Sequence, residues 1–201
     1  MKLAACAKLS LGPETRVWFR AFDPRHIVTP LGAAHTTSFP TRFSPGPNSL
    51  SPFPIMYLSE NQLVCLREVE ALLGSSKIAP LPNPAFTWTI INVRVTLRQV
   101  ADLTLPAEQK RLGTTAQELT GDWEGYQMRT PYSSVPHPTG TAPTQDLGEA
   151  LNSIPGIEGF RTLSAKVPDQ RNLIVFPQKL LKGSRIVFLD RAIGKVYEIK
   201  G

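Results

Sequence analysis

The sequence predicts an α+β fold, in which a strand-rich core carries two or three packed helices. Several short apolar runs of strand length are separated by segments rich in proline and glycine, of which the chain holds 19 and 14. Two stretches combine helical spacing with capping residues. Without an internal repeat or a linker, the 201 residues are expected to form one domain. Residues 1–15 are expected to be an N-terminal extension of this domain, and residues 182–201 its C-terminal strands.

The first half is predicted to hold two strands and one helix. Residues 16–22 form a strand, with Val17, Phe19 and Ala21 on one face. Residues 23–54 contain seven prolines and are loop-like, and loops of this length are usually functional. The short apolar strand 54–58 leads into a helix that Ser59 caps and Gly74 ends. Its apolar stripe comprises Leu63, Leu66, Val69 and Leu73.

The second half is predicted to be richer in strands. Residues 87–100 alternate, which indicates a half-buried strand with Ile91, Val93, Val95 and Leu97 on its inner face and Asn92, Arg94, Thr96 and Arg98 on its outer face. Pro106 is suited to the first position of a short helix. After the Pro-rich loop 130–143, Thr144 caps a helix with Leu147, Leu151 and Ile154 on one face. The remaining predicted strands are 159–163, 172–176, 185–189 and 195–199.

Composition excludes several classes of protein. Hydrophobic residues make up 41% of the chain, so it is not disordered. Two cysteines make no disulfide framework, and His26, His35 and His137 lie far apart, so no metal site is expected. The apolar runs are too short for a signal peptide or a spanning helix, and we expect a soluble cytoplasmic protein without membrane contact. The net charge of +6 is dispersed rather than clustered, which disfavours direct nucleic-acid binding.

Three separated segments carry side chains suited to a phosphorylated ribosyl substrate. The first is Thr41-Arg42-Phe43. The second is Tyr57-Leu58, followed by a helix that bears Glu68. The third is Leu163-Ser164, followed by Asn172-Leu173-Ile174-Val175-Phe176. A guanidinium grips phosphate oxygens in two places, and a fixed carboxylate stabilises positive charge that develops on a ribose.

This ordered set resembles the RES domain, a family named for its arginine, glutamate and serine. The resemblance covers residues 16–180. It implies a fold similar to ADP-ribosyltransferases, with a split, mostly antiparallel β core, a few helices and a cleft for NAD⁺. It also implies a bacterial toxin that degrades NAD⁺ by hydrolysing or phosphorolysing the nicotinamide–ribosyl bond. NAD⁺ is then a substrate rather than a resident cofactor, and inorganic phosphate is a candidate co-substrate. The implied partner is a cognate antitoxin, often with an Xre-type DNA-binding domain.

The resemblance assigns Glu68, Arg42 and Ser164 as the catalytic residues. Glu68 lies eleven positions after Tyr57, as in the family, with the small Cys65 three positions before it. Glu70 is a competitor, because its helical angle falls nearer the apolar stripe. The register of Arg42 is less regular, since Thr41 replaces the family's glycine and the stretch to Tyr57 is longer.

Four further residues are candidates for binding NAD⁺, namely Arg20, Phe43, Tyr57 and Asn172. The aromatic-Arg run that ends at Arg20 fits the opening strand of the family. An aromatic face such as that of Tyr57 can stack on nicotinamide, although a core position with a bonded hydroxyl is an alternative. No Ser-His-Asp arrangement accompanies Ser164, so its hydroxyl is expected to bind the substrate or orient Glu68. Its alternative is a strand-end serine that bonds the local backbone.

Two other functions stay open at this stage. The chain could transfer ADP-ribose to a protein or nucleic acid, or it could be an inactive binding module, which the Thr41 departure leaves open. Neither a G-x-G-x-x-G after a strand nor a Walker A motif occurs, which disfavours a Rossmann dehydrogenase or a P-loop enzyme.

Overall fold

A computed structural model describes residues 1–73, 81–85, 87–127 and 141–201. Its centre is a seven-stranded sheet in the order β1-β2-β7-β6-β5-β8-β9. The strands are β1 (Leu11–Phe22), β2 (Met56–Ser59), β5 (Thr89–Asp102), β6 (Gly159–Leu163), β7 (Arg171–Val175), β8 (Arg185–Asp190) and β9 (Lys195–Lys200). A separate two-stranded sheet pairs β3 (Leu72–Leu73) with β4 (Leu81–Pro82).

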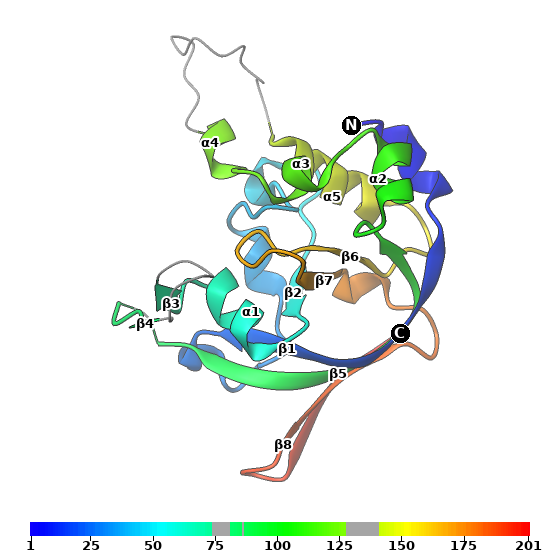
Figure 1. Ribbon diagram of the computed structural model, residues 1–201. Helices are drawn as coiled ribbons and strands as arrows, with labels where there is room; N and C mark the ends of the chain where they lie inside the picture. The colour runs from blue at the N-terminus through cyan, green and yellow to red at the C-terminus, as the bar shows by residue number, and fades with distance from the viewer. Residues whose placement is uncertain (74–80, 86, 128–140) are drawn as a thin grey trace.

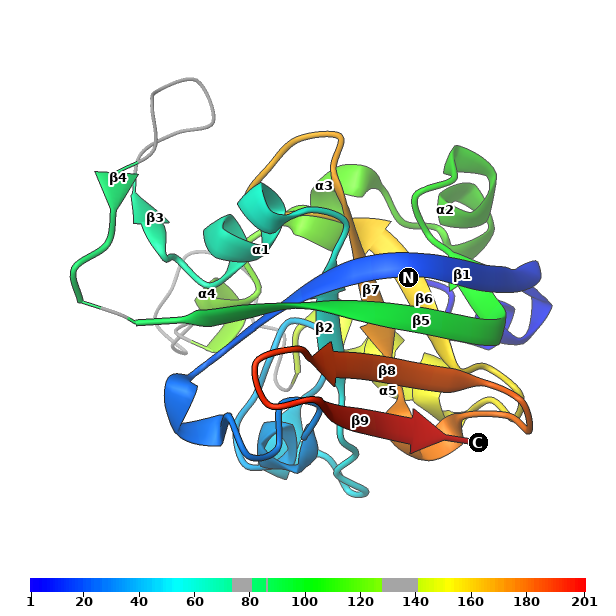
Figure 2. The same ribbon diagram turned by 90° about the horizontal axis from the view of Figure 1, so that it is seen from below.

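The sheet closes on itself because β1 has a partner on each edge. It pairs with β5 along almost its whole length and with β2 through Phe19 and Ser59. β5 then pairs in parallel with β6 at residues 100–102 and antiparallel with β8 at residues 94–96, so the sheet divides along β5. All other pairings in this sheet are antiparallel. Figure 2 shows β1 and β5 side by side, with β8 and β9 beyond them.

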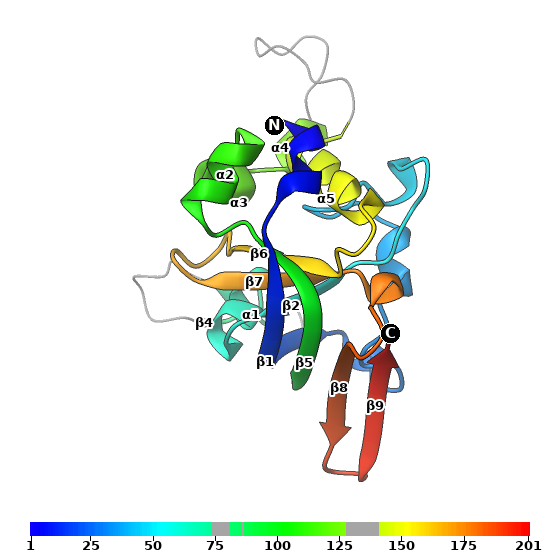
Figure 3. The same ribbon diagram turned by 90° about the vertical axis from the view of Figure 1, so that its right-hand side faces the viewer.

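Short helices surround this core. They are α1 (Gln62–Glu68), α2 (Pro106–Leu112), α3 (Ala116–Thr120), α4 (Glu124–Gln127) and α5 (Pro143–Ser153). Helices α2, α3 and α5 gather at the end of the molecule that also holds the N-terminus, while α1 lies beside β2 (Figure 1). The β8–β9 hairpin projects from the opposite end (Figure 3). The predicted α+β class, a sheet-dominated core with few helices, is confirmed.

The long loop between β1 and β2 is organised by 3₁₀ turns rather than by regular elements. These turns are η2 (Pro24–His26), η3 (Ala34–Thr37) and η4 (Gly46–Asn48). Two further 3₁₀ turns are η1 (Leu3–Lys8), near the N-terminus, and η5 (Pro177–Lys179), between β7 and β8. The buried side chains form two clusters, one under α5 that includes Phe43, Phe160 and Phe176, and one inside β1, β5 and β8 that includes Trp18 and Val93.

Several predicted elements are confirmed. In β5 the inner and outer faces are those that the alternation predicts, with Ile91, Val93, Val95 and Leu97 buried. Pro106 occupies the start of α2. In α5 the side chains of Leu147 and Leu151 are buried. Residues 130–140 of the second Pro-rich loop, His137 among them, lie outside the described residues.

The buried face of β1 is not the one that carries Val17, Phe19 and Ala21. Trp18, Arg20 and Phe22 point inward, whereas Val17 is 44% exposed. The alternation of apolar and polar residues along a strand predicts which face is buried only when one face is polar. In β1 both faces carry apolar residues, so the pattern does not decide. Packing chose the face that buries the larger indole and turns the Arg20 guanidinium inward.

The helix after β2 is shorter than predicted. Ser59 belongs to β2, and the side chain of Asn61 accepts a hydrogen bond from the Val64 N–H to cap α1. The helix ends at Glu68, and Glu70 follows in the left-handed region with φ 56°. The predicted stop, Gly74, lies outside the described residues. The bounds of α1 differ from the predicted ones, and so does its buried side. The helix buries Val64, Cys65 and Arg67, whereas Leu63 of the predicted stripe is 48% exposed.

The cap of α5 also differs from the prediction. Ala142 is the N-terminal cap and Pro143 the first helical residue, so Thr144 lies inside the first turn. The side chain of Gln145 accepts a hydrogen bond from the N–H of Ala142, the capping residue itself, and Thr144 makes no capping hydrogen bond. Among the described residues, no helix has the length and apolar character to cross a membrane.

Candidate active site

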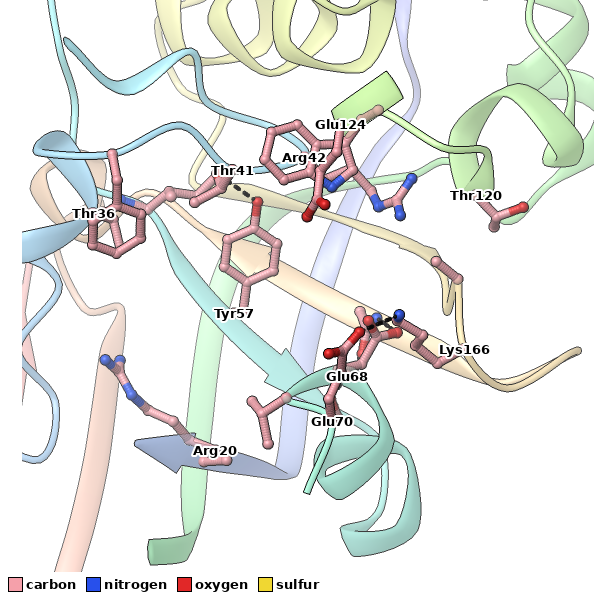
Figure 4. A pocket seen from close by; sticks show the side chains of 18 of the residues that line it. Arg20, Thr36, Thr41, Arg42, Tyr57, Glu68, Glu70, Thr120, Glu124 and Lys166 are labelled. Carbon is pink, nitrogen blue, oxygen red and sulfur yellow. Dashed lines mark hydrogen bonds and ion pairs between the residues drawn. The ribbon is translucent and has the colours of Figure 1, made fainter. Parts of the chain in front are cut away.

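A cavity of about 810 Å³ opens between the β1–β2 loop, the end of α1, the α3–α4 segment and the β6–β7 loop. Its volume lies in the range of about 300–1,000 Å³ that small-molecule sites span. Figure 4 shows Arg20 and Arg42 on either side of Tyr57, with Glu68 facing them from the end of α1. Of the seven residues that the sequence analysis selects, five line the cavity: Arg20, Arg42, Tyr57, Glu68 and Asn172.

Glu68, the last residue of α1, is held by two side chains from the β6–β7 region. Its Oε1 accepts hydrogen bonds from Ser164 Oγ at 2.6 Å and from Asn172 Nδ2 at 2.7 Å. Ser59 Oγ donates to Asn172 Oδ1 at 2.8 Å, which fixes which end of the amide faces Glu68. No described residue donates a hydrogen bond to Glu68 Oε2. The carboxylate is therefore oriented through one oxygen, and the other is left for a ligand.

Ser164 follows β6 and is buried behind Glu68 rather than lining the cavity. Its hydroxyl oxygen accepts the N–H groups of Lys166 at 3.2 Å and Val167 at 3.0 Å. With both acceptor positions used, its proton is directed to Glu68. The hydroxyl thus bonds the local backbone and orients the glutamate at the same time, and this geometry does not suit a nucleophile.

Arg42 lies at the side of the cavity formed by the α3–α4 segment. Its Nη1 donates to the Gly121 carbonyl oxygen. Burial lowers the pKa of Arg42, and the nearby Glu68 carboxylate opposes this shift. The neighbouring Thr41, which replaces the glycine of the family pattern, accepts a hydrogen bond from Tyr57 Oη at 2.9 Å. The substitution therefore adds a contact that positions Tyr57.

Tyr57 extends from β2 between the two arginines. Its ring lines the cavity and also packs against the core cluster under α5. Its hydroxyl donates to Thr41 and accepts the Phe43 N–H at 3.1 Å. Burial raises the pKa of Tyr57 to about 12, so the phenol stays neutral at physiological pH. Tyr57 is thus a core residue with a bonded hydroxyl whose ring also lines the cavity, and its stacking on nicotinamide stays a prediction.

Phe43 is a correction to the predicted binding residues. Its ring is 1% exposed and packs edge-on against Phe160, with ring centroids 5.1 Å apart. The chain makes a tight turn here, in which Thr41 and Ser44 exchange backbone hydrogen bonds. That turn sends the side chain of Phe43 into the core while Arg42 stays at the cavity. We therefore no longer assign Phe43 to a ligand.

Arg20 is a buried cation without an acidic partner among the described residues. It is 6% exposed, and its Nη2 donates to the Gly32 carbonyl oxygen at 2.6 Å. Its Nη1 is buried without a hydrogen bond. Burial lowers the pKa of Arg20 to about 10, so it remains charged at neutral pH. A buried charge of this kind is costly unless an anion or another acceptor completes it.

Glu70, the competitor of Glu68, lies at the rim of the cavity. It is exposed and forms an ion pair with Lys166 at 2.8 Å. Glu70 already has a cationic partner in solvent, whereas Glu68 faces the interior with an unbonded oxygen. The geometry thus favours Glu68 as the carboxylate that meets a ligand.

Sequence reasoning missed part of the cavity wall. His35, Phe39, Asp122, Trp123, Glu124 and Lys166 also line it. They lie in loops and short turns, where no periodic pattern predicts the direction of a side chain. Among the described residues, no group of three or more His, Cys, Asp or Glu side chains could hold a metal ion.

Comparisons with known proteins place this arrangement in a family. The model of the RES domain matches residues 17–192. The chain belongs to the RES domain family. The match spans Arg20, Arg42, Glu68 and Ser164, so the predicted family membership is confirmed. No curated protein sequence matches the chain.

The fold of this RES domain protein is also found in a solved structure. The crystal structure of the M. tuberculosis MbcT–MbcA toxin–antitoxin complex contains a chain that superposes with a TM-score of 0.60 at 18% sequence identity. The alignment covers 95% of the present chain and 93% of that chain. At this level of identity the likeness shows a shared fold.

Proposed function

We propose that this RES domain protein is a toxin that degrades NAD⁺ by cleaving the nicotinamide–ribosyl bond, and that a cognate antitoxin neutralises it. The observation that carries the proposal is the Glu68 carboxylate, oriented by Ser164 and Asn172 in a cavity that also holds two arginines. Membership of the RES domain family supports it, as does the similar fold of a chain from a toxin–antitoxin complex.

Glu68 is suited to stabilise the transition state of this reaction. Cleavage of the bond builds oxocarbenium character on the ribose, and a fixed carboxylate lowers the energy of that charge without reorganising. Nicotinamide leaves as a neutral group, so a strong general acid is not needed. The hydrogen bonds to Oε1 hold the carboxylate, and Oε2 is the oxygen that meets the ribose or orients the acceptor.

The two arginines and Tyr57 are suited to the rest of the dinucleotide. A guanidinium matches phosphate oxygens in two places, and Arg42 is assigned to the pyrophosphate. Arg20 Nη1, which lacks a hydrogen bond, supplies another donor on the far side of Tyr57. The ring of Tyr57 lies between them and offers a face to nicotinamide.

The acceptor in this proposal is water or inorganic phosphate. Product analysis distinguishes them, because hydrolysis yields ADP-ribose and phosphorolysis yields its 1″-phosphate. The proposal includes no resident cofactor and no metal. It places the reaction in the cytoplasm, where the antitoxin, with or without an Xre-type DNA-binding domain, blocks the cavity.

The direct test is release of nicotinamide from NAD⁺ by the purified protein, with and without phosphate. Glu68→Gln removes the negative charge and is expected to abolish turnover. Glu70→Gln is the matched control, since it makes the same chemical change two residues away at the rim. We expect it to retain activity within a few-fold of wild type.

Three outcomes would contradict the proposal. The first is no release of nicotinamide by folded wild-type protein. The second is loss of turnover in Glu70→Gln rather than Glu68→Gln. The third is labelled ADP-ribose recovered on a protein or nucleic acid instead of in a small product, which would indicate a transferase.

A further inference from the structure

A second cavity adjoins the first at the end of the molecule that holds α3, α4 and the start of α5. Its volume is about 440 Å³. Gly121, Asp122 and Trp123 line both cavities and form the boundary between them. The two cavities therefore adjoin along this segment.

The second cavity contains an unsatisfied polar group. Thr144, in the first turn of the 11-residue helix α5, lines it. The residue is 3% exposed, and its hydroxyl has no hydrogen-bond partner. Buried hydroxyls are normally bonded, so an unpartnered hydroxyl on a residue that lines a cavity is a position that a ligand can complete.

The other side chains define the chemistry of that ligand. Two carboxylates line the cavity, Glu118 and Asp122, and no Arg or Lys is among the described residues that line it. Glu118 Oε2 accepts the Thr114 hydroxyl at 2.7 Å, and Asp122 Oδ1 accepts the Gly125 N–H at 3.1 Å. One oxygen of each carboxylate has no hydrogen bond from a described residue. Acidic walls repel phosphate but accept hydroxyl groups, as the carboxylates that bind ribose in dinucleotide sites do.

Aromatic rings complete the second cavity. Trp123 and Tyr126 both line it. Aromatic side chains stack on nucleic bases of any sequence, because every base has a π face. A flat ring and a ribose with free hydroxyls together match the lining of this cavity, and a nucleoside carries both.

Arg42 links the two cavities. Its guanidinium donates to the carbonyl oxygen of Gly121 on the shared boundary. Both Glu68 in the first cavity and Asp122 at the boundary act on its charge. A pyrophosphate held by Arg42 would thus have the Glu68 carboxylate on one side and the second cavity on the other.

We propose that the second cavity binds the adenosine half of NAD⁺, with the adenine against Trp123 and the ribose hydroxyls on Glu118 and Asp122. The Thr144 hydroxyl bonds an adenosine polar atom. This inference rests on the proposed function, since it uses the first cavity for the nicotinamide half. It makes Trp123 and Thr144 binding residues that the sequence analysis did not select.

The test is binding of AMP to the purified protein by calorimetry. Trp123→Ala should weaken AMP about tenfold or more, the scale of a lost base–aromatic stack. Thr144→Val keeps the shape of the side chain and removes one hydrogen bond, so it should weaken AMP about threefold to tenfold. Glu70→Gln is the control and should bind AMP as wild type does, because Glu70 is exposed at the rim of the first cavity, pairs with Lys166 and does not line the second cavity.

Nicotinamide mononucleotide is the second probe, and it separates local from global damage. Thr144→Val should bind it with wild-type affinity, because Thr144 lines the second cavity only. Wild-type AMP affinity in both Trp123→Ala and Thr144→Val would overturn the inference, as would absence of AMP binding to the wild type. Failure of the proposed function shows separately, as absence of nicotinamide release from a protein that still binds AMP.

Discussion

Two glutamates, Glu158 and Glu68, show how this fold treats a carboxylate that holds structure and one that faces a cavity. Glu158, just before β6, is fully buried, and its carboxylate accepts three backbone N–H groups. Arg98 and Gln99 of β5 donate to Oε2, and Leu181, before β8, donates to Oε1. Glu68 is half-buried and accepts two side-chain hydrogen bonds on one oxygen only.

The difference indicates what each region is built to do. Glu158 has donors on both oxygens and joins β5, β6 and the segment before β8 where the sheet divides. Glu68 has donors on one oxygen, so part of its hydrogen-bonding capacity is reserved for a ligand. Two arginines repeat the contrast. Arg161 lies near Glu14 at 3.6 Å and Asp102 at 3.4 Å, whereas Arg20 has no acidic partner among the described residues.

The largest expected effect is on catalysis. Glu68→Gln should lower kcat for nicotinamide release by roughly 10²–10⁴-fold, the range for loss of a positioned ionised group. Glu158→Gln should leave kcat of the folded protein within a few-fold of wild type, because Glu158 does not line the cavity. The measurement is kcat for nicotinamide release in both variants, corrected for the folded fraction given by circular dichroism. Equal loss of kcat in the two variants would erase the contrast.

The next effect is on the stability of the paired arginine. Arg161→Met leaves Asp102 without its cation and takes one of two cations from the buried Glu14, which keeps Arg16, and it should lower the free energy of unfolding by about 3 kcal/mol. Arg20→Met removes a buried charge that has no acidic partner and should change it by less than about 1 kcal/mol. Urea titrations of both variants provide the comparison. In kinetics, Arg20→Met should raise KM for NAD⁺, and a stability loss as large as that of Arg161→Met would contradict this assignment.

A smaller difference is expected between the glutamates themselves. Glu158→Gln places an amide N–H against backbone donors and should cost roughly 2–3 kcal/mol of unfolding free energy. Glu68→Gln keeps an oxygen for Ser164 and Asn172 and should cost less than about 1 kcal/mol. Chemical denaturation of both variants at one pH gives the two values. A reversed order would mean that the Glu68 network, too, holds the fold together.

The smallest effect is on the pH dependence of stability, through His35 at the cavity. Burial lowers the pKa of His35, and the charges of Arg20 and His26 lower it further. The unfolded chain, with a histidine pKa of about 6.5, then binds more protons than the folded one below that pH. Stability should therefore fall slightly as pH drops from about 6.5 through the folded pKa. His35→Gln should flatten this slope in urea titrations at several pH values, and an unchanged slope would exclude His35 as its source.

The sequence was sufficient where a pattern is local. The strict alternation of residues 91–98 predicts which side of β5 is buried, since period two leaves one choice when one face is apolar and the other polar. Pro106 marks the start of α2 because its fixed φ suits that position. The spacing from Tyr57 to Glu68, read as a family pattern, pointed to a carboxylate that lines the cavity, as its competitor Glu70 also does.

Local patterns failed where two choices look alike. Both faces of β1 carry apolar residues, and packing against β5 and the cavity decided between them. Phe43 and Arg42 are neighbours in the chain, yet the turn at Thr41–Ser44 sends one side chain into the core and the other to the cavity. The length of α1 depends on the left-handed Glu70, a conformation that glutamate rarely adopts and that its sequence context does not signal.

The amino-acid sequence by itself determined the strands of the core, the family and the order of the arginine, glutamate and serine along the chain. Tertiary structure alone decided how they meet: Ser164 and Asn172 reach Glu68 across 96 and 104 residues of sequence, and the second cavity joins α3, α4 and α5. The physical reason is the distance along the chain over which each interaction acts. Periodicity and capping act over one or two turns of chain, whereas the position of a carboxylate oxygen in a cavity depends on contacts between segments that only packing brings together.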